Sequence, residues 1–205
     1  MAVSKVEICN FALSIISQEP IVSISSPTSD NERRCAKWYS QAIQFVLSKH
    51  PWNFAQKRAM LPQETAPAFG YSHSFALPSD YVRLVQRGLT KSDSVTIYND
   101  YAIEGSSLLL NYSGTGSFPI IYTFNEERVG RYPPWFVNLV AHQLAIYLSP
   151  EVNRTQSEIN ALFQLFDMAL QEAKQLDGQE VPAITVTNSR YLRGLQRNSV
   201  YTVEE

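Results

Sequence analysis

The chain has 205 residues, enough for one domain or two small ones, and its 44% hydrophobic and 18% charged residues are ordinary for a globular protein with a sizeable core. Its 17 lysines and arginines stand against 19 acidic residues, a balance that argues against a protein that coats nucleic acid or a membrane surface. No apolar run approaches the roughly 20 residues that span a bilayer, and the N-terminus is too polar for a signal peptide, so we expect the protein to stay where it is made.

Two helices are predicted at the start of the chain, each opened by a capping box. Ser4 and Glu7 open the first, which we expect to end near Gln18. Ser29 and Glu32 open the second, which should begin near residue 31 and stop before the proline at 51. The apolar residues recur at three- and four-residue steps in both: Val6, Cys9, Leu13 and Ile16, then Cys35, Trp38, Tyr39, Ala42, Phe45 and Val46. Both cysteines lie on these stripes, which indicates buried thiols rather than a disulfide or a metal pair.

The chain turns sharply after the second helix, and a β region follows. Pro51 ends the helix, and we expect Trp52 and Phe54 to pack back against the helix end as a structural turn. Between residues 70 and 130 glycine is frequent and the apolar period shifts toward two. This pattern predicts a meander of about four strands at residues 94–98, 101–104, 108–112 and 119–124, with a tight hairpin turn at 99–100. Residues 56–61 and 81–86 are candidates to join the sheet.

Two further helices are predicted after the β region. Pro133 and Pro134 set the start of the third, which should end at Pro150. Thr155 and Glu158 open the fourth with another capping box, and it should run to residue 178. Its predicted buried stripe consists of Ile159, Leu162, Phe163, Phe166, Leu170, Ala173 and Leu176.

These elements predict an α+β protein: a four-helix bundle with an inserted antiparallel β domain and an extended C-terminal arm. Residues 1–54 supply two helices of the bundle, 55–130 the β domain, 131–178 the other two helices, and 179–205 the arm. The four stripes leave no obvious surplus seam, so we expect the isolated chain to be monomeric or a loose oligomer.

The arm has no helical stripe, and it mixes apolar residues with three arginines. Two interpretations remain open. A chain end of this kind is either a frayed terminus or an arm that becomes ordered on a partner, through side-chain pockets and an added strand.

The sequence contains no recognisable catalytic, nucleotide or metal motif. The histidines at 50, 73 and 142 lack metal-site spacing, and no nucleophile elbow or phosphate loop is present. Glu126 and Glu127 are adjacent, and neighbouring residues do not face each other in a regular element. We therefore expect neither catalysis nor a cofactor.

Five short pieces of the sequence stand out together: ICNFALSII with EPI at 8–16 and 19–21, HPWNFA with KRA at 50–59, FALPSDYVR at 75–83, YAIEG at 101–105, and PWF at 134–136. In this order they resemble the tail tubular protein A family, the head-to-tail adaptors of short-tailed phages. The resemblance covers roughly residues 5–178. Gln18 departs from it, because a glycine would be expected to end the first helix there.

The resemblance implies a structural virion protein at the head–tail junction, made in the host bacterial cytoplasm. Such adaptors form a dodecameric ring, dock on the portal of a DNA-filled head, and carry the tail nozzle, of the tail tubular protein B type, and the tail fibres. Genome DNA passes through the ring without sequence-specific binding, and the net charge of −2 suits a channel that does not retain it. On this interpretation the arm binds the portal, and the expected contacts are Arg190, Tyr191, Leu192, Arg193 and Arg197.

Two other classes of function remain open: a small binding module that presents a loop of the β domain, and a cell-wall glycan hydrolase whose site is not visible in the sequence. The mass of the protein alone and with its portal separates them from a ring-forming adaptor. On the adaptor interpretation, we expect the chain to join a ring only on a portal template.

Overall fold

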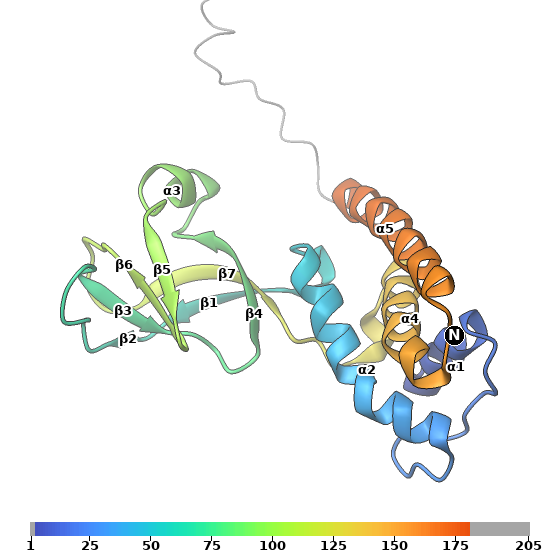
Figure 1. The fold of residues 1–205 in the computed structure, drawn as a ribbon. Coiled ribbons are helices and arrows are strands. Elements are labelled where there is room, and N and C mark those ends of the chain that lie inside the picture. The colour runs from blue at the N-terminus through green and yellow to red at the C-terminus, as the bar shows by residue number, and fades with distance from the viewer. Residues whose placement is uncertain (1–2, 181–205) are drawn as a thin grey trace, which may run out of the picture.

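A computed structural model describes residues 3–180, which form a mixed α+β fold of helices and antiparallel sheets. The helices other than the short α3 gather on one side of the molecule, and the strands lie with α3 on the other (Figure 1). The helices are α1 (Lys5–Ile15), α2 (Asp30–Lys49), α3 (Lys91–Thr96), α4 (Pro134–Leu148) and α5 (Gln156–Gln179). Short 3-10 turns occupy Asn53–Ala55, Val129–Arg131 and Ser149–Val152. The strands are β1 (Gln56–Leu61), β2 (Gln63–Glu64), β3 (His73–Ala76), β4 (Tyr81–Arg87), β5 (Tyr101–Glu104), β6 (Ser107–Leu110) and β7 (Phe118–Phe124).

The three predicted capping boxes are confirmed, because each places its helix start where the sequence indicated. In α1, α2 and α5 the cap hydroxyl accepts from the third backbone N–H of the helix, and the glutamate there accepts from the cap N–H. Each box pairs donors that the first turn of a helix would otherwise leave without partners. The ends of α2 and α5 also agree with the prediction to within one or two residues.

The exit of α1 differs from the prediction, since the helix ends at Ile15 rather than near Gln18. Ser17 adopts a left-handed conformation with φ of 50°, and the backbone N–H of Gln18 donates to the carbonyl of Leu13 at 2.9 Å. Ser17 therefore takes the left-handed position that we expected glycine to occupy at 18.

Helix α4 is the centre of the helical side, and it packs against α1, α2 and α5. Nine of its fifteen residues are buried, which explains why its sequence is apolar on almost every face. Cys9 of α1 and Cys35 of α2 are free and fully buried, as predicted. Their mutual hydrogen bond, together with burial, raises the pKa of Cys9, so this thiol stays protonated.

The strands form two sheets with the orders β1-β7-β4 and β2-β3-β6-β5, and every pairing in them is antiparallel. Strand β7 is central in the first sheet, and six of its seven residues are buried. The predicted meander is wrong at this point, because β6 pairs with β3 and β5 whereas β7 pairs with β1 and β4. The strands at 56–61, 81–87, 101–104 and 107–110 lie where the sequence suggested.

The predicted strand at 94–98 and its hairpin turn are also wrong. Thr90 and Asp93 form a fourth capping box, which starts the short helix α3. Ser94 is buried there, and its hydroxyl donates to the carbonyl of Arg87 at 2.6 Å while the Arg87 N–H donates back to it at 2.5 Å. These bonds give partners to the backbone N–H and carbonyl of Arg87 at the end of β4. The chain therefore folds back as a helix instead of forming a strand that pairs with β5.

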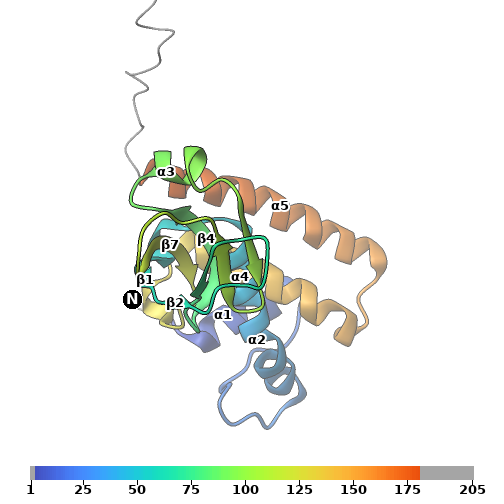
Figure 2. The same cartoon turned by 90° about the vertical axis from the view of Figure 1, so that its left-hand side faces the viewer.

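Helix α2 joins the two sides of the molecule. It contacts β4 and β7 of the first sheet as well as α4, and the buried side chains of the helices and sheets form one continuous cluster. The view turned by 90° shows the sheets in front of the helical side, with α5 running along the upper part of it (Figure 2). Helix α5 packs mainly against α4 and therefore keeps much of its surface exposed.

Candidate interaction surfaces

The predicted structural turn lies between the end of α2 and the start of α4. Trp52 is completely buried, and its Nε1–H donates to the carbonyl oxygen of Val46 at 2.8 Å. Its ring lies 5.0 Å from that of Trp135 and 6.0 Å from that of Phe136, measured between centroids. Phe54 is half-buried and packs on Phe136 at 4.7 Å. Both faces of the indole are therefore occupied by the protein itself, which leaves no face for a ligand.

The predicted portal contacts Arg190, Tyr191, Leu192, Arg193 and Arg197 lie outside the described residues. Their role stays a prediction.

A buried carboxylate that the sequence analysis missed fastens the last turn of α5 to the structural turn. Asp177 is 2% exposed, accepts from the backbone N–H of Asn53 at 2.9 Å, and lies 3.2 Å from Nε2 of His50. The Asn53 side chain in turn donates to the Asp177 carbonyl at 2.7 Å. The sequence did contain a signal for the burial of this acid. Asp177 follows Leu170 and Ala173 at three- and four-residue steps, which places it on the same buried face of α5.

The pair of His50 and Asp177 is structural. Burial raises the pKa of Asp177 and lowers the pKa of His50, so their environment disfavours the charged form of each. Nucleophilic catalysis by such a pair would need a hydroxyl or thiol bonded to the other imidazole nitrogen. Among residues 3–180 none is hydrogen-bonded to His50.

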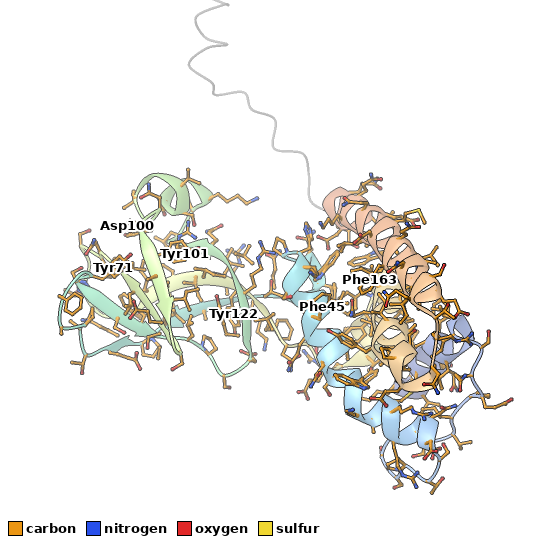
Figure 3. The ribbon with its side chains drawn as sticks, viewed as in Figure 1. Phe45, Tyr71, Asp100, Tyr101, Tyr122 and Phe163 are labelled. Carbon is orange, nitrogen blue, oxygen red and sulfur yellow. The ribbon has the colours of Figure 1, made fainter. Side chains whose placement is uncertain are left out.

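An apolar groove lies between α2 and α5 on the helical side, with α4 as its floor. Its volume is about 570 Å³. Figure 3 shows Phe45 on α2 and Phe163 on α5, one on each side of this groove. We call it the α2–α5 groove, and its lining is Trp38, Phe45, Lys49, Gln143, Ile146, Tyr147, Pro150, Glu151, Ile159, Phe163, Phe166 and Asp167.

Charged groups stand at the rim of the α2–α5 groove. Glu151 accepts from Lys37 at 2.8 Å and from the Trp38 indole at 2.7 Å, and these bonds lower the pKa of its carboxyl. The ammonium of Lys49 lies 4.1 Å from the centroid of the Phe45 ring. Within the described part of the chain Lys49 forms no ion pair, so its charge is available to a partner.

Helix α5 exposes apolar side chains that the sequence placed in the core. Phe163 and Leu176 are 49% and 38% exposed, so their assignment to the buried stripe is wrong. Leu165 and Met168 are exposed as well, at 43% and 62%. The physical reason is that α5 has one principal neighbour, α4, and one neighbour covers only part of a helix surface. The expectation that the helices leave no surplus apolar seam is therefore wrong too.

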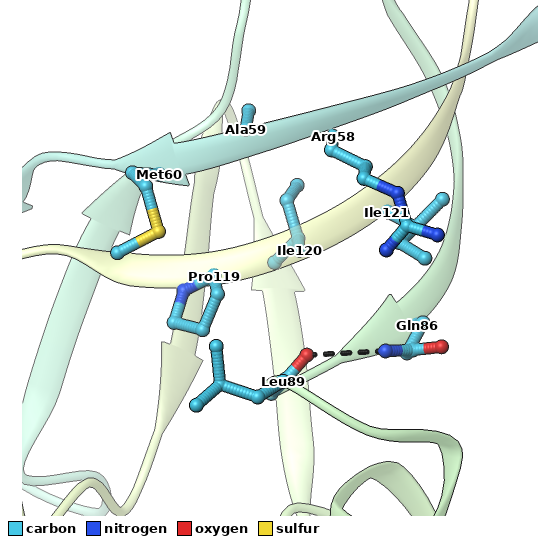
Figure 4. Close-up of a pocket in the computed structure, with 9 residues that line it drawn as sticks. Arg58, Ala59, Met60, Gln86, Leu89, Pro119, Ile120 and Ile121 are labelled. Atoms are coloured by element: carbon cyan, nitrogen blue, oxygen red, sulfur yellow. Dashed lines mark hydrogen bonds between the residues drawn. The ribbon is translucent and has the colours of Figure 1, made fainter.

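A second hollow lies on the open face of the β1-β7-β4 sheet, where Met60 and Leu89 are exposed (Figure 4). Its volume is about 240 Å³, below the roughly 300 Å³ at which small-molecule sites begin. The Gln86 side chain donates to the Gly88 carbonyl at 3.2 Å in this hollow. Arg58 is the charged residue in its lining, so the hollow holds no acid–base pair.

Tyrosines and acids form local pairs on the sheets, where Figure 3 labels several of them. The Tyr122 hydroxyl donates to Asp80 at 2.9 Å, and Asp80 also pairs with Lys57 at 2.6 Å. Burial, with the neighbouring Asp80 carboxylate, raises the pKa of Tyr122 to about 12. The Tyr71 hydroxyl donates to Asp100 at 3.2 Å. These acids are occupied by hydrogen bonds within the protein.

Residues 3–180 contain no cluster of three or more histidine, cysteine or acidic side chains placed to hold a metal ion. In the same residues no helix combines the length and hydropathy needed to cross a membrane. Neither a scan against protein-family models nor a search of curated proteins finds a match for this chain.

Proposed function

We propose that this chain is the subunit of a ring-shaped adaptor that joins the portal of a DNA-filled phage head to the tail nozzle and fibres. The five sequence pieces that resemble the tail tubular protein A family, in the order that the family has them, lead to this proposal. In the structure three of the five pieces fall at junctions: HPWNFA joins α2 to β1, FALPSDYVR joins β3 to β4, and PWF opens α4, whereas ICNFALSII lies mostly within α1 and YAIEG mostly within β5.

The observation that carries the proposal is the apolar surface that α5 leaves exposed. Phe163, Leu165, Met168 and Leu176 are each more than a third exposed on this one helix. Exposed apolar residues gathered on a single element mark a protein–protein interface, whereas scattered ones do not. A ring of identical subunits needs such surface on every copy, because each subunit contacts two neighbours.

On this proposal the four long helices form a bundle that makes the wall of the ring. The arm that follows the bundle binds the portal. The adaptor performs no catalysis and needs no cofactor, and the channel passes DNA without reading its sequence. The protein acts in the virion, at the head–tail junction.

The test is the mass of the full-length protein, measured by native mass spectrometry alone and after mixing with the portal protein of the same phage. We expect a largely monomeric chain alone, since the four partly exposed apolar side chains of α5 are few beside the roughly 20–30 residues per partner of a stable interface. With the portal we expect a ring of about twelve copies, the number that the resemblance implies. A chain that never binds the portal would contradict the proposal, whereas a stable ring without portal would contradict only the need for a template.

A further inference from the structure

Helix α5 is apolar around much more of its circumference than the core uses. Its buried stripe consists of Leu162, Phe166, Leu170 and Ala173. At 3.6 residues per turn, Phe163 lies on one flank of that stripe, and Leu165, Met168 and Leu176 lie on the other, roughly 140–160° from Phe163 about the helix axis. Two separate exposed patches therefore flank one buried stripe.

The two patches have opposite shapes. The flank that carries Phe163 forms a wall of the α2–α5 groove, so it is concave. The other flank is convex along Leu165, Met168 and Leu176, because within residues 3–180 no element makes more than marginal contact with α5 on that side. We call this flank the α5 ridge, defined by Leu165, Met168 and Leu176; it spans 12 residues, or about 16 Å along the axis.

The two patches also hold one pair of opposite charges, Glu172 on the ridge and Lys49 at the groove; the groove lining further contains two acids, Glu151, which pairs with Lys37, and Asp167. Glu172 is exposed one turn after Met168 and one turn before Leu176, so it stands within the ridge. Lys49 stands at the rim of the groove. Neither side chain has an ion-pair partner in the part of the chain that the structure describes.

We propose that the α5 ridge of one copy docks into the α2–α5 groove of the next copy, with Glu172 of one facing Lys49 of the other. The contact is heterologous, because it joins two different patches, and it can repeat from copy to copy. Pairing of ridge on ridge would leave every groove open. That the repeated contact closes into a ring rests on the function proposed above.

The contact is weak for a single pair of copies and strong only when repeated. Each ridge offers three partly exposed aliphatic side chains, and an exposed ion pair adds only about 0.2–1 kcal/mol. Copies held side by side on a template gain the contact at high effective concentration. The same weak contact between ridge and groove thus accounts for a monomer in solution and for a ring on the portal.

The test is crosslinking, at high protein concentration and with a short bismaleimide, of full-length variants that each carry one added surface cysteine. Asp167→Cys places a thiol at the groove, and Ala161→Cys places one on the ridge flank, one turn before Leu165; both positions are exposed. The native Cys9 and Cys35 are buried and should not react. Ser40→Cys is the matched control, because Ser40 is exposed on α2 but lines a different hollow, beside Tyr39 and Asn125.

We expect covalent dimers in the mixture of the Asp167→Cys and Ala161→Cys variants, and background amounts when Ser40→Cys replaces Asp167→Cys. Adding Met168→Ser to the ridge variant should abolish the product, while Leu89→Ser, which removes an exposed apolar side chain from the sheet side of the molecule, should leave it unchanged. Lys49→Glu should reduce the yield by up to about fivefold, the factor for an exposed ion pair, and adding Glu172→Lys to the ridge copy should restore it.

Three results would overturn the proposal. One is a mixture that gives no more dimer than the Ser40→Cys control. Another is efficient dimerisation of Ala161→Cys alone, which would indicate a ridge-on-ridge contact. The third is slow maleimide labelling of Asp167→Cys in dilute monomer, which would indicate that the chain's own residues 181–205, or another partner, cover the groove.

Failure of this contact and failure of the proposed ring can be told apart. A ring on the portal without crosslinking between groove and ridge would leave the adaptor function standing and require another interface. Crosslinking without any portal-bound ring would leave the contact standing as an open chain of copies, and would contradict the adaptor.

Discussion

Replacement of Trp52 by alanine should destabilise the whole protein, because the indole closes the corner between α2, the structural turn and α4. The side chain has no exposed surface, and the rings of Trp135 and Phe136 pack against it. Truncation of a buried tryptophan costs about 3–5 kcal/mol from lost burial and the cavity left behind. We expect the upper part of this range, since the aromatic walls of the cavity are held by α4 and cannot collapse inward. The change also removes the hydrogen bond to the carbonyl of Val46.

Thermal unfolding followed by circular dichroism measures this effect. For a chain of this size each kcal/mol lowers Tm by about 2–4 °C, so a loss of about 4–5 kcal/mol in Trp52→Ala should lower Tm by about 8–20 °C. Trp38→Ala is the matched control, because Trp38 lines the open α2–α5 groove and should cost much less. If Trp52→Ala left Tm unchanged and abolished portal binding, Trp52 would be a ligand-stacking platform rather than a core residue.

Three further predictions concern a carboxylate, a glycine and the C-terminal arm. Five hydrogen bonds from residues 22–29 hold the pKa of Glu32 well below its ordinary value of about 4.3, so its stabilisation is complete above that pH and is lost as the pH falls below it. The Tm difference between wild type and Glu32→Gln should therefore be largest near neutral pH and shrink below about pH 4; a constant difference would contradict this assignment. Gly88→Ala should destabilise by about 1–3 kcal/mol in denaturant unfolding, because Gly88 has φ of 81° and an added Cβ would lie 2.7 Å from the Cβ of Asp93; an unchanged midpoint would refute the conformation given to this turn. Removal of residues 181–205 should preserve Tm and abolish co-purification with the portal, whereas unchanged portal affinity would transfer that role to the helical surface.

Local signals in the sequence determined where the four long helices begin and where α2 and α5 end. A capping box involves residues three apart, so Ser29 and Glu32 define the start of α2 whatever packs against it later. Pro51 ended the same helix for an equally local reason. Burial of the two cysteines also followed from their place on helical stripes.

Strand pairing was decided by contacts between residues far apart in the chain. The segment 118–124 was recognisable as a strand from the sequence. Its pairing with residues 56–61 and 81–87 was not, because it depends on how the tertiary fold places these distant strands side by side. At residues 94–98, β propensity competed with a capping box at Thr90 and with the bond between Ser94 and Arg87, and the helix prevailed.

The candidate interface depended most on the tertiary structure. Periodicity showed that α5 is apolar at Phe163 and Leu176, and it could not show that no other element covers them. Asp177 illustrates the converse, since an acid at the end of a helix is expected in solvent and is buried here because Asn53 and His50 meet it. The sequence by itself thus determined which residues of each helix are apolar, through the helical period. Only the packing of α5 on α4 decided which of them remain exposed to a partner, because burial depends on neighbours that lie far away in the chain.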